Sequence, residues 1–246
     1  MNIIYNEDCL ETMKDMVDNF IDLTITSPPY DDLRIYNGYS FNFEAVAFEL
    51  HRVTKQGGVV VWIVGDSTIK GSESGTSFRQ ALGFKDAGFN LHDTMIWRKT
   101  NPMPKFKHKR YFDVFEYMFI LSKGQPKTFN PLLQANKRAG ELYDYTAKLK
   151  TTGKVRTKKT FNINDERYKD NIWECAVSKN ETDHPAVFPQ SLIEDHIVSW
   201  SNQDDLVYDP FIGSGTTALA ARSLSRNYIG SEISQEYCQI AEQRLS

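Results

Sequence analysis

An unbroken apolar run, Val59-Val60-Val61-Trp62-Ile63-Val64, constrains the fold of this chain more than any other sequence feature. A strand with one face in water alternates apolar and polar side chains, whereas a continuously apolar strand is buried on both faces. Such strands are typical of parallel sheets that carry helices on both sides. The run therefore predicts an inner strand of an α/β sheet.

Helical and strand patterns alternate around this run, as a doubly wound sheet requires. At 246 residues, one α/β domain with an inserted lobe is expected. The motif Gln56-Gly57-Gly58 is expected to end the helix that precedes the apolar run. We expect strands at residues 2–5, 20–26, 90–97, 114–121, 205–208 and 226–232, with 90–97 and 114–121 as an antiparallel pair, and helices at 8–16, 41–54, 77–87, 191–199 and from 217 onward.

A short motif, Ser27-Pro28-Pro29-Tyr30, follows the expected strand 20–26. Proline has no N–H, so the carbonyls of this segment are available as acceptors beside the Ser27 hydroxyl. These acceptors can hold the amino edge of a planar heterocycle, and the ring of Tyr30 can stack on its face. The motif predicts a pocket for such a ring.

A second motif, Asp209-Pro210-Phe211-Ile212-Gly213-Ser214-Gly215-Thr216, joins the strand 205–208 to a helix. Its glycines allow a ligand to approach the backbone, and the helix N-terminus offers N–H groups to an anion. The loop is neither GxGxxG nor a P-loop. Glu232 ends the next strand, where an acid can accept hydrogen bonds from a ribose diol. The loop therefore predicts a nucleotide-like cofactor.

Together, these motifs resemble the amino-methylating DNA methyltransferases that use S-adenosylmethionine. Residues 6–10 are similar to the loop whose acid meets the cofactor's adenine amino group, and residues 184–189 are similar to the segment that closes over the cofactor. The resemblance implies that Ser27, Pro28, Pro29 and Tyr30 are catalytic. It implies that the cofactor is bound by Asp8, Cys9, Phe188, Asp209, Pro210, Phe211, Gly213, Ser214, Gly215, Thr216 and Glu232. Taken alone, Asp8 also fits a helix cap, and Phe188 and Phe211 also fit core positions.

The catalytic motif precedes the cofactor loop, which is the order of the family's beta class. This order implies a circularly permuted Rossmann-like fold with a mostly parallel seven-stranded sheet and one hairpin at its edge. Residues 1–122 are then the catalytic part, residues 123–182 the target-recognition region and residues 183–246 the cofactor-binding part. The aromatic residues of 123–182 can either stack on bases or pack a small lobe.

The distribution of charge favours a nucleic-acid partner, although the net charge is −3. Residues 98–159 contain 16 Lys or Arg but only 4 Asp or Glu, and the rest of the chain is acidic. Such asymmetry is the footprint of a polyanion-binding surface, although a solvated loop face would look the same. We expect double-stranded DNA as the partner, with phosphate contacts from Lys105, Lys107, Lys109 and Arg110.

Several alternatives for the substrate remain open. The Thr-Ser-Pro-Pro-Tyr form is typical of the cytosine-N4 branch, but some adenine-N6 enzymes also carry serine. Methylation of RNA or of a protein glutamine uses related enzymes, and a non-catalytic DNA-binding or cofactor-sensing module is a further reading. Cytosine C5 methylation needs a cysteine nucleophile, usually after proline, whereas Cys9, Cys175 and Cys238 follow Asp, Glu and Tyr.

Composition limits the cellular location and the kinds of metal or disulfide site that this chain can have. No apolar run reaches 18 residues and the N-terminus does not resemble a signal peptide, so a cytoplasmic protein without a membrane partner is expected. The three cysteines are widely spaced and form no CxxC motif, so we expect no disulfide and no zinc site. Relatives of the beta class often dimerise, and the sequence leaves both a homodimer and a cognate restriction endonuclease open as partners.

Overall fold

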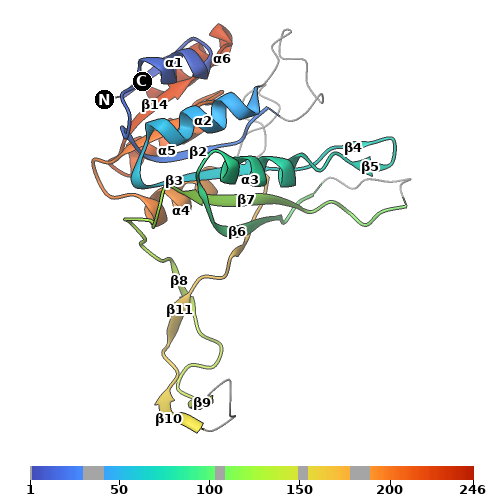
Figure 1. Ribbon diagram of the computed structural model, residues 1–246, viewed down its shortest axis with the longest axis vertical. Coiled ribbons are helices and arrows are strands. Elements are labelled where there is room, and N and C mark those ends of the chain that lie inside the picture. Colours follow the sequence, from blue (N-terminus) through green and yellow to red (C-terminus); the bar gives the residue numbers. More distant parts are fainter. Residues whose placement is uncertain (1, 30–41, 103–108, 149–154, 178–188) are drawn as a thin grey trace. The chain divides into compact units, whose positions relative to one another are not determined.

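The computed structural model describes residues 2–29, 42–102, 109–148, 155–177 and 189–246 (Figure 1). The chain divides into two compact units. The first comprises Met1–Asn130 and Asn171–Ser246, and the second comprises Pro131–Asp170. The second unit lies inside the stretch 123–182 that the sequence predicted as a target-recognition region.

The first unit is built on one mostly parallel sheet. Strand β7 is antiparallel to both of its neighbours, β3 and β6, which confirms the predicted antiparallel pair, and all other neighbours run parallel. In spatial order the strands are β1 (Asn2–Tyr5), β14 (Asn227–Ser231), β13 (Leu206–Asp209), β2 (Ile21–Thr26), β3 (Thr54–Val64), β7 (Phe115–Ser122), β6 (Asn90–Lys99) and β12 (Ile172–Cys175).

Strand β12 makes this sheet one strand larger than the seven expected. It pairs in parallel with β6, and Trp97 Nε1 donates a hydrogen bond to the Cys175 carbonyl at 3.0 Å. Trp173 of β12 is buried, with its ring centroid 4.5 Å from that of His196. A four-residue strand with one buried side chain carries too little periodicity to be found in the sequence.

The first residues of β3 correct a second expectation. Helix α2 (Phe43–Val53) ends immediately before Thr54, so Gln56-Gly57-Gly58 lie within the strand and do not end the helix. Pairing with β2 shifts between Ile21, which opposes Thr54, and Leu23, which opposes Val59. Gly57 has φ +82°, so these glycines serve a bulge, which local sequence does not distinguish from a helix stop.

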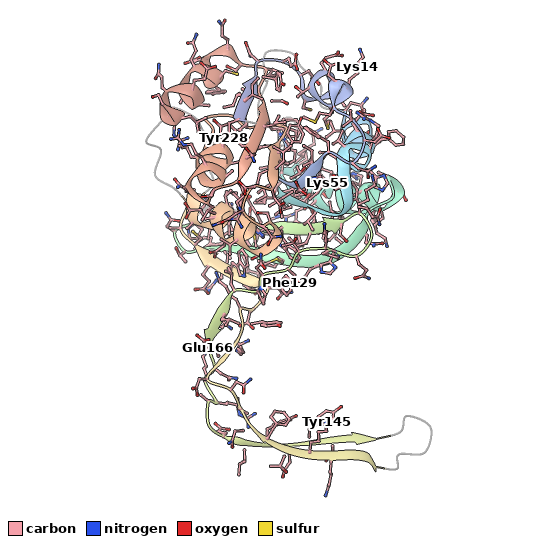
Figure 2. All side chains as sticks on the ribbon, turned by 90° about the vertical axis from the view of Figure 1, so that its left-hand side faces the viewer. Lys14, Lys55, Phe129, Tyr145, Glu166 and Tyr228 are labelled. Carbon is pink, nitrogen blue, oxygen red and sulfur yellow. The ribbon has the colours of Figure 1, made fainter. Side chains whose placement is uncertain are left out.

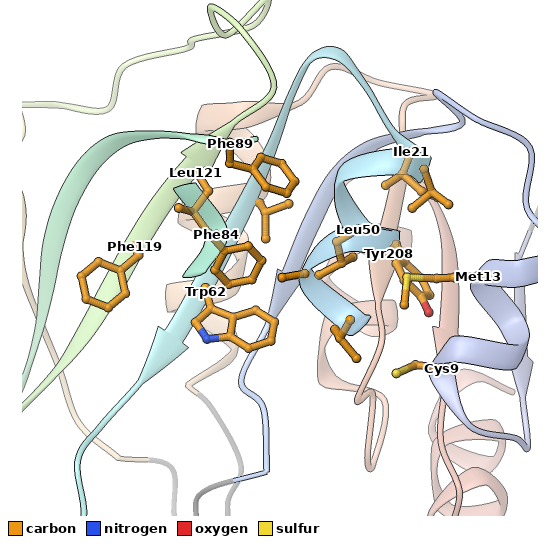
Figure 3. Packing of buried hydrophobic residues seen from close by; sticks show 14 of the residues in the cluster. Cys9, Met13, Ile21, Leu50, Trp62, Phe84, Phe89, Phe119, Leu121 and Tyr208 are labelled. Carbon is orange, nitrogen blue, oxygen red and sulfur yellow. The ribbon is translucent and has the colours of Figure 1, made fainter. Parts of the chain in front are cut away.

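Helices cover both faces of the sheet, as the apolar run predicted. Trp62 points into the core cluster that β3 forms with α1, α2 and α3, where it meets Phe84 edge to face at 4.8 Å (Figure 3). Its neighbours Val61 and Ile63 point to the opposite face and are fully buried. The helices are α1 (Cys9–Asp15), α2, α3 (Thr76–Asp86), α4 (Gln190–Trp200), α5 (Thr216–Ser223) and α6 (Gln235–Leu245).

The second unit consists of two antiparallel strand pairs. Strand β8 (Leu133–Ala135) pairs with β11 (Glu166–Tyr168), and β9 (Leu142–Lys148) pairs with β10 (Val155–Asn162). Tyr145 on β9, labelled in Figure 2, is 47% exposed. A further small hairpin, β4 (Thr68–Ile69) with β5 (Ser72–Glu73), belongs to the first unit. Within the described ranges, no helix is both long and apolar enough to span a bilayer.

Candidate active site

The sequence motifs meet at one edge of the sheet. Strands β1, β14, β13, β2 and β3 run in the same direction, so the segments that follow them emerge together at the carboxyl edge. Register supports this alignment, since Thr26 lies opposite Trp62 and Asp209 lies opposite Gly230. Ligands of open α/β sheets bind at this edge.

A direct hydrogen bond joins the two principal motifs. Thr26 Oγ1, at the end of β2, donates to Asp209 Oδ1 at 2.6 Å. Ser27 is the next residue and is half-buried, Pro28 is buried and Pro29 is half-buried. The predicted catalytic motif therefore begins one residue from a contact with the predicted cofactor loop. Tyr30 lies outside the described residues.

The Asp209 carboxylate is buried and accepts hydrogen bonds from protein groups. Besides the Thr26 bond, Asp209 Oδ2 accepts from Thr217 Oγ1 at 2.7 Å, and Oδ1 accepts from the Phe211 N–H at 3.0 Å. Burial raises the pKa of Asp209 to about 6, and these hydrogen bonds limit the rise. The structure shows Asp209 holding the loop in place, while its contact with a cofactor stays a prediction.

The glycine loop turns tightly onto the start of α5. Gly213 has φ +50° and Gly215 has φ +85°, and Gly215 is the N-cap residue of α5. A Cβ at Gly215 would lie 2.8 Å from the Ala241 Cβ of α6, so glycine is required both for conformation and for space. Pro210, Ser214 and Thr216 are buried in this turn.

Arg244 of α6 supports the same loop and was missed in the sequence. Its guanidinium donates to the Ser214 carbonyl at 2.6 Å and to Ser214 Oγ at 3.1 Å. A basic residue in the last turn of a helix usually faces solvent or the helix carbonyls. Nothing local distinguishes Arg244 from such a residue, because its role depends on how α6 packs.

Glu232 connects the end of β14 to the glycine loop. Its Oε2 accepts from the Gly213 N–H at 3.0 Å, and its Oε1 accepts from the Ser234 N–H at 2.8 Å. Burial raises the pKa of Glu232, and hydrogen bonds from the backbone of Ser234, Gly213 and Ile233 oppose the rise. Each carboxylate oxygen can accept a second hydrogen bond, so the side chain fits the ribose diol that the sequence analysis assigned to it.

Asp8 and Cys9 lie at the start of α1 beside this edge. Asp8 Oδ1 accepts from the Leu10 N–H at 2.8 Å, which confirms the helix-cap reading. Cys9 is buried, and burial raises the pKa of its thiol to about 12. Burial likewise raises the pKa of Cys238 to about 11. Such thiols stay protonated at neutral pH and do not suit a cysteine nucleophile.

The aromatic wall of the site is described only in part. Phe211 is half-buried and meets Trp62 edge to face, with ring centroids 6.3 Å apart. It therefore packs on the core cluster, which agrees with the core position that the sequence analysis left open. Its contact with a cofactor stays a prediction. Phe188 lies outside the described residues.

The four candidate phosphate-binding residues are placed only in part. Lys109 is exposed, and Arg110 forms an ion pair with Glu73 Oε1 at 2.8 Å and donates to the Gly71 carbonyl at 2.7 Å. Arg110 is therefore committed to the β4–β5 hairpin, while 37% of its side chain stays accessible. Lys105 and Lys107 lie outside the described residues.

The chemistry of this edge fits S-adenosylmethionine. The cofactor presents a carboxylate, a sulfonium cation, a ribose diol and an adenine ring. The N-terminus of α5 suits an anion, and the acids Asp8 and Glu232 suit a cation and hydroxyl groups. Among the described residues, no group of His, Cys, Asp and Glu is placed to hold a metal ion.

Comparison with known proteins identifies the family. The family model described as DNA methylase matches residues 21–243. The orphan methyltransferase M.BamHII of Bacillus amyloliquefaciens is 55% identical over 235 residues, which cover 92% of this chain and 88% of that protein. The type II methyltransferase M.HinfI of Haemophilus influenzae is 29% identical over 272 residues, covering 100% of this chain and 68% of that protein.

Solved structures share the fold. The PvuII DNA methyltransferase (cytosine-N4-specific) matches with a TM-score of 0.75 and 24% identity, covering 100% of this chain and 86% of that one. The M1.HpyAVI–SAM complex matches with a TM-score of 0.65 and 27% identity, covering 99% and 100% of the two chains. The chain therefore belongs to the N6/N4 family of DNA methylases, amino-methyltransferases whose methyl donor is S-adenosylmethionine.

Proposed function

We propose that this protein transfers a methyl group to the N4 amine of a cytosine in double-stranded DNA. The observation that supports the proposal is the Thr26–Asp209 hydrogen bond, because it joins the strand end that leads into Ser27 and Pro28 to the loop that begins at Asp209. The choice of cytosine follows the resemblance of Thr26-Ser27-Pro28-Pro29-Tyr30 to the cytosine-N4 form of the motif. Adenine N6 is the alternative, since both amines lie next to a ring nitrogen acceptor.

The residues act by holding the amine in a reactive geometry. An exocyclic amine is a poor nucleophile because its lone pair is delocalised into the ring. When the Ser27 hydroxyl and the Pro28 carbonyl accept hydrogen bonds from its two N–H groups, the nitrogen is drawn toward tetrahedral geometry. Its lone pair is then localised on nitrogen and points out of the ring plane. Good alignment of this kind lowers a barrier by roughly 7–11 kcal/mol. Bound cofactor supplies an electrophilic methyl group.

No covalent enzyme intermediate is needed in this scheme. Ser27 serves as a hydrogen-bond acceptor and not as a nucleophile, and the proton of the product leaves to water, because a neutral hydroxyl is a weak base. The buried, protonated thiols of Cys9 and Cys238 agree with chemistry that uses no cysteine. The target base must leave the duplex, at a cost of a few kcal/mol, before its amine can reach the pocket.

The unit Pro131–Asp170 is proposed to read the target sequence. Its β9–β10 ribbon has the form that fits the major groove of DNA. One face carries Tyr143 and Phe161, which contact each other at 5.6 Å between ring centroids, together with Tyr145 and its cross-strand partner Lys159. The opposite face carries polar groups, among them the Thr160–Asp144 hydrogen bond of 2.6 Å. Both faces are exposed and supply hydrogen-bonding or stacking groups.

Transfer of tritiated methyl groups from S-adenosylmethionine to DNA, RNA and total protein tests this proposal. We expect label in duplex DNA alone, and we expect Pro28→Ala to bind the cofactor normally while losing most turnover. Label confined to RNA or protein would refute the DNA assignment. Wild-type protein that binds duplex DNA and cofactor but transfers no label would favour the non-catalytic module.

A further inference from the structure

We propose that Asp209 is a positioning residue that couples the catalytic motif to the cofactor loop through two threonine hydroxyls. We call Thr26, Asp209 and Thr217 the Asp209 clamp. The inference rests on the proposed function and goes beyond it, because it assigns separate tasks to the two oxygens of one carboxylate. Oδ1 fixes the end of the catalytic strand, and Oδ2 fixes the first turn of α5.

The geometry of the clamp is tight and dry. Thr26 is 0% exposed, and Asp209 and Thr217 are each 2% exposed. Solvent therefore cannot supply a substitute for a hydrogen bond that is lost among these three residues. The two hydroxyl bonds measure 2.6 and 2.7 Å, the short range of hydroxyl–carboxylate bonds. The Phe211 N–H adds a bond of 3.0 Å to Oδ1 and orients the carboxylate against its own loop.

The position of each threonine in the chain gives it a distinct effect. Thr26 is the last residue of β2, so its hydroxyl determines where the peptide leading into Ser27 and Pro28 leaves the sheet. Thr217 lies in the first turn of α5, so its hydroxyl determines how the helix N-terminus faces the loop. Loss of the Thr26 bond should therefore affect the methyl-transfer step, and loss of the Thr217 bond should affect cofactor affinity.

Thr24 provides a matched control on the same strand. It precedes Thr26 by two residues and therefore points to the same face of β2. It is 0% exposed, and its hydroxyl has no hydrogen-bond partner among the residues that the structure describes. Thr24→Val and Thr26→Val thus replace the same buried atom on one strand, but only the second removes a bond to Asp209.

The test compares turnover at saturating DNA with cofactor affinity measured by calorimetry. Thr26→Val should lower kcat roughly 10- to 100-fold, the range for slight misplacement of reacting groups. It should leave the Kd for S-adenosylmethionine within about twofold of wild type, a change under about 0.4 kcal/mol. Thr26→Ser, which retains the hydroxyl, should restore kcat. Thr217→Val should raise that Kd about tenfold, whereas Thr24→Val should change neither quantity.

Two results would overturn the clamp. One is equal kcat in Thr26→Val and Thr24→Val, and the other is equal cofactor affinity in Thr217→Val and Thr24→Val. The affinity comparison needs no methyl acceptor. If the wild-type protein methylates no DNA, the proposed function fails while the clamp is still decided by binding. Thermal melting of each variant identifies any loss of folding. The Thr26→Ser variant shows whether a loss of kcat in Thr26→Val comes from the missing hydroxyl or from a general disturbance of the strand.

Discussion

The fold buries the Asp209 carboxylate almost completely. Three hydrogen bonds from protein groups offset part of the free energy that this burial costs. Its pKa of about 6 lies above the ordinary value of 3.8, because burial penalises the charged form more than the bonds from Thr217, Thr26 and Phe211 favour it. Between pH 4 and 6, roughly, the folded protein therefore holds more of this proton than the unfolded chain does. The contribution of Asp209 to stability falls as pH rises through this window and is constant above it.

Asp209→Asn should remove this pH dependence. The free energy of unfolding of the wild type minus that of the variant should decrease, on the order of 3 kcal/mol in total, as pH rises from about 4 to about 6. Glu232, whose pKa is also raised, is present in both proteins, but the Asp209 charge adds to that rise, so the difference also contains the lowering of the Glu232 pKa in the variant. Urea unfolding of both proteins across this range measures it. A difference that does not change with pH would contradict the assigned burial.

Individual residues show where the sequence was informative and where it was not. Residue type and motif order sufficed to place Ser27, Asp209 and Glu232 at one edge of the sheet. The hydrogen bonds of Asp209 and Glu232 to backbone and hydroxyl groups were not predictable, because they depend on the turn geometry of the loop. The role of Arg244 was not predictable from the sequence either, because only the packing of α6 brings its guanidinium to Ser214.

At the scale of elements, the junction of the glycine loop with α5 depends on a close approach to α6. Gly215→Ala should weaken cofactor binding at least tenfold and destabilise the fold, because φ is +85° and a Cβ would lie 2.8 Å from Ala241. Gly71→Ala is the matched control, with φ +84° and no atom within 4 Å of the added Cβ. It should cost only about 1 kcal/mol of backbone strain.

Calorimetric titration with S-adenosylmethionine and urea unfolding distinguish the two glycine variants. Equal cofactor affinity in Gly215→Ala and Gly71→Ala would show that the α5–α6 approach is irrelevant to the site. Equal losses of stability would show that backbone conformation alone, without the Ala241 contact, decides the effect.

Long elements followed from sequence patterns, whereas short or irregular ones did not. The apolar run 59–64 and the helical spacing of 41–54 gave β3 and α2 because burial on a sheet or helix face sets their periods. The pattern Gln56-Gly57-Gly58 predicts a helix stop but forms a bulge in β3, since glycine with positive φ serves both purposes. Strand β12 was missed because its pairing with β6 is set by tertiary structure.

At the scale of the whole molecule, the two units should divide the work between target reading and chemistry. The Lys169 N–H bonds to the Leu132 carbonyl at 2.8 Å, so the chain enters and leaves the second unit at nearly the same place. A short Gly-Ser linker can therefore replace residues 133–168. The shortened protein should bind S-adenosylmethionine within about threefold of wild type but lose at least tenfold in affinity for duplex DNA.

Fluorescence anisotropy over a range of salt concentrations measures this loss. Removal of the basic residues of the second unit should also flatten the dependence of log K on log salt, because fewer counterions are released. Unchanged DNA affinity and slope would place the recognition surface elsewhere. A simultaneous loss of cofactor binding would show that the two units do not act independently.

The most direct test of the account is nucleoside mass spectrometry of DNA from cells that express this protein. We expect N4-methylcytosine at a defined sequence, absent from cells without the protein and strongly reduced with Ser27→Ala. N6-methyladenine at a defined sequence would retain the amine chemistry and overturn the choice of base. DNA that gains neither modified base, or gains 5-methylcytosine instead, would contradict the central claim that the Ser27 motif presents an exocyclic amine to the methyl donor.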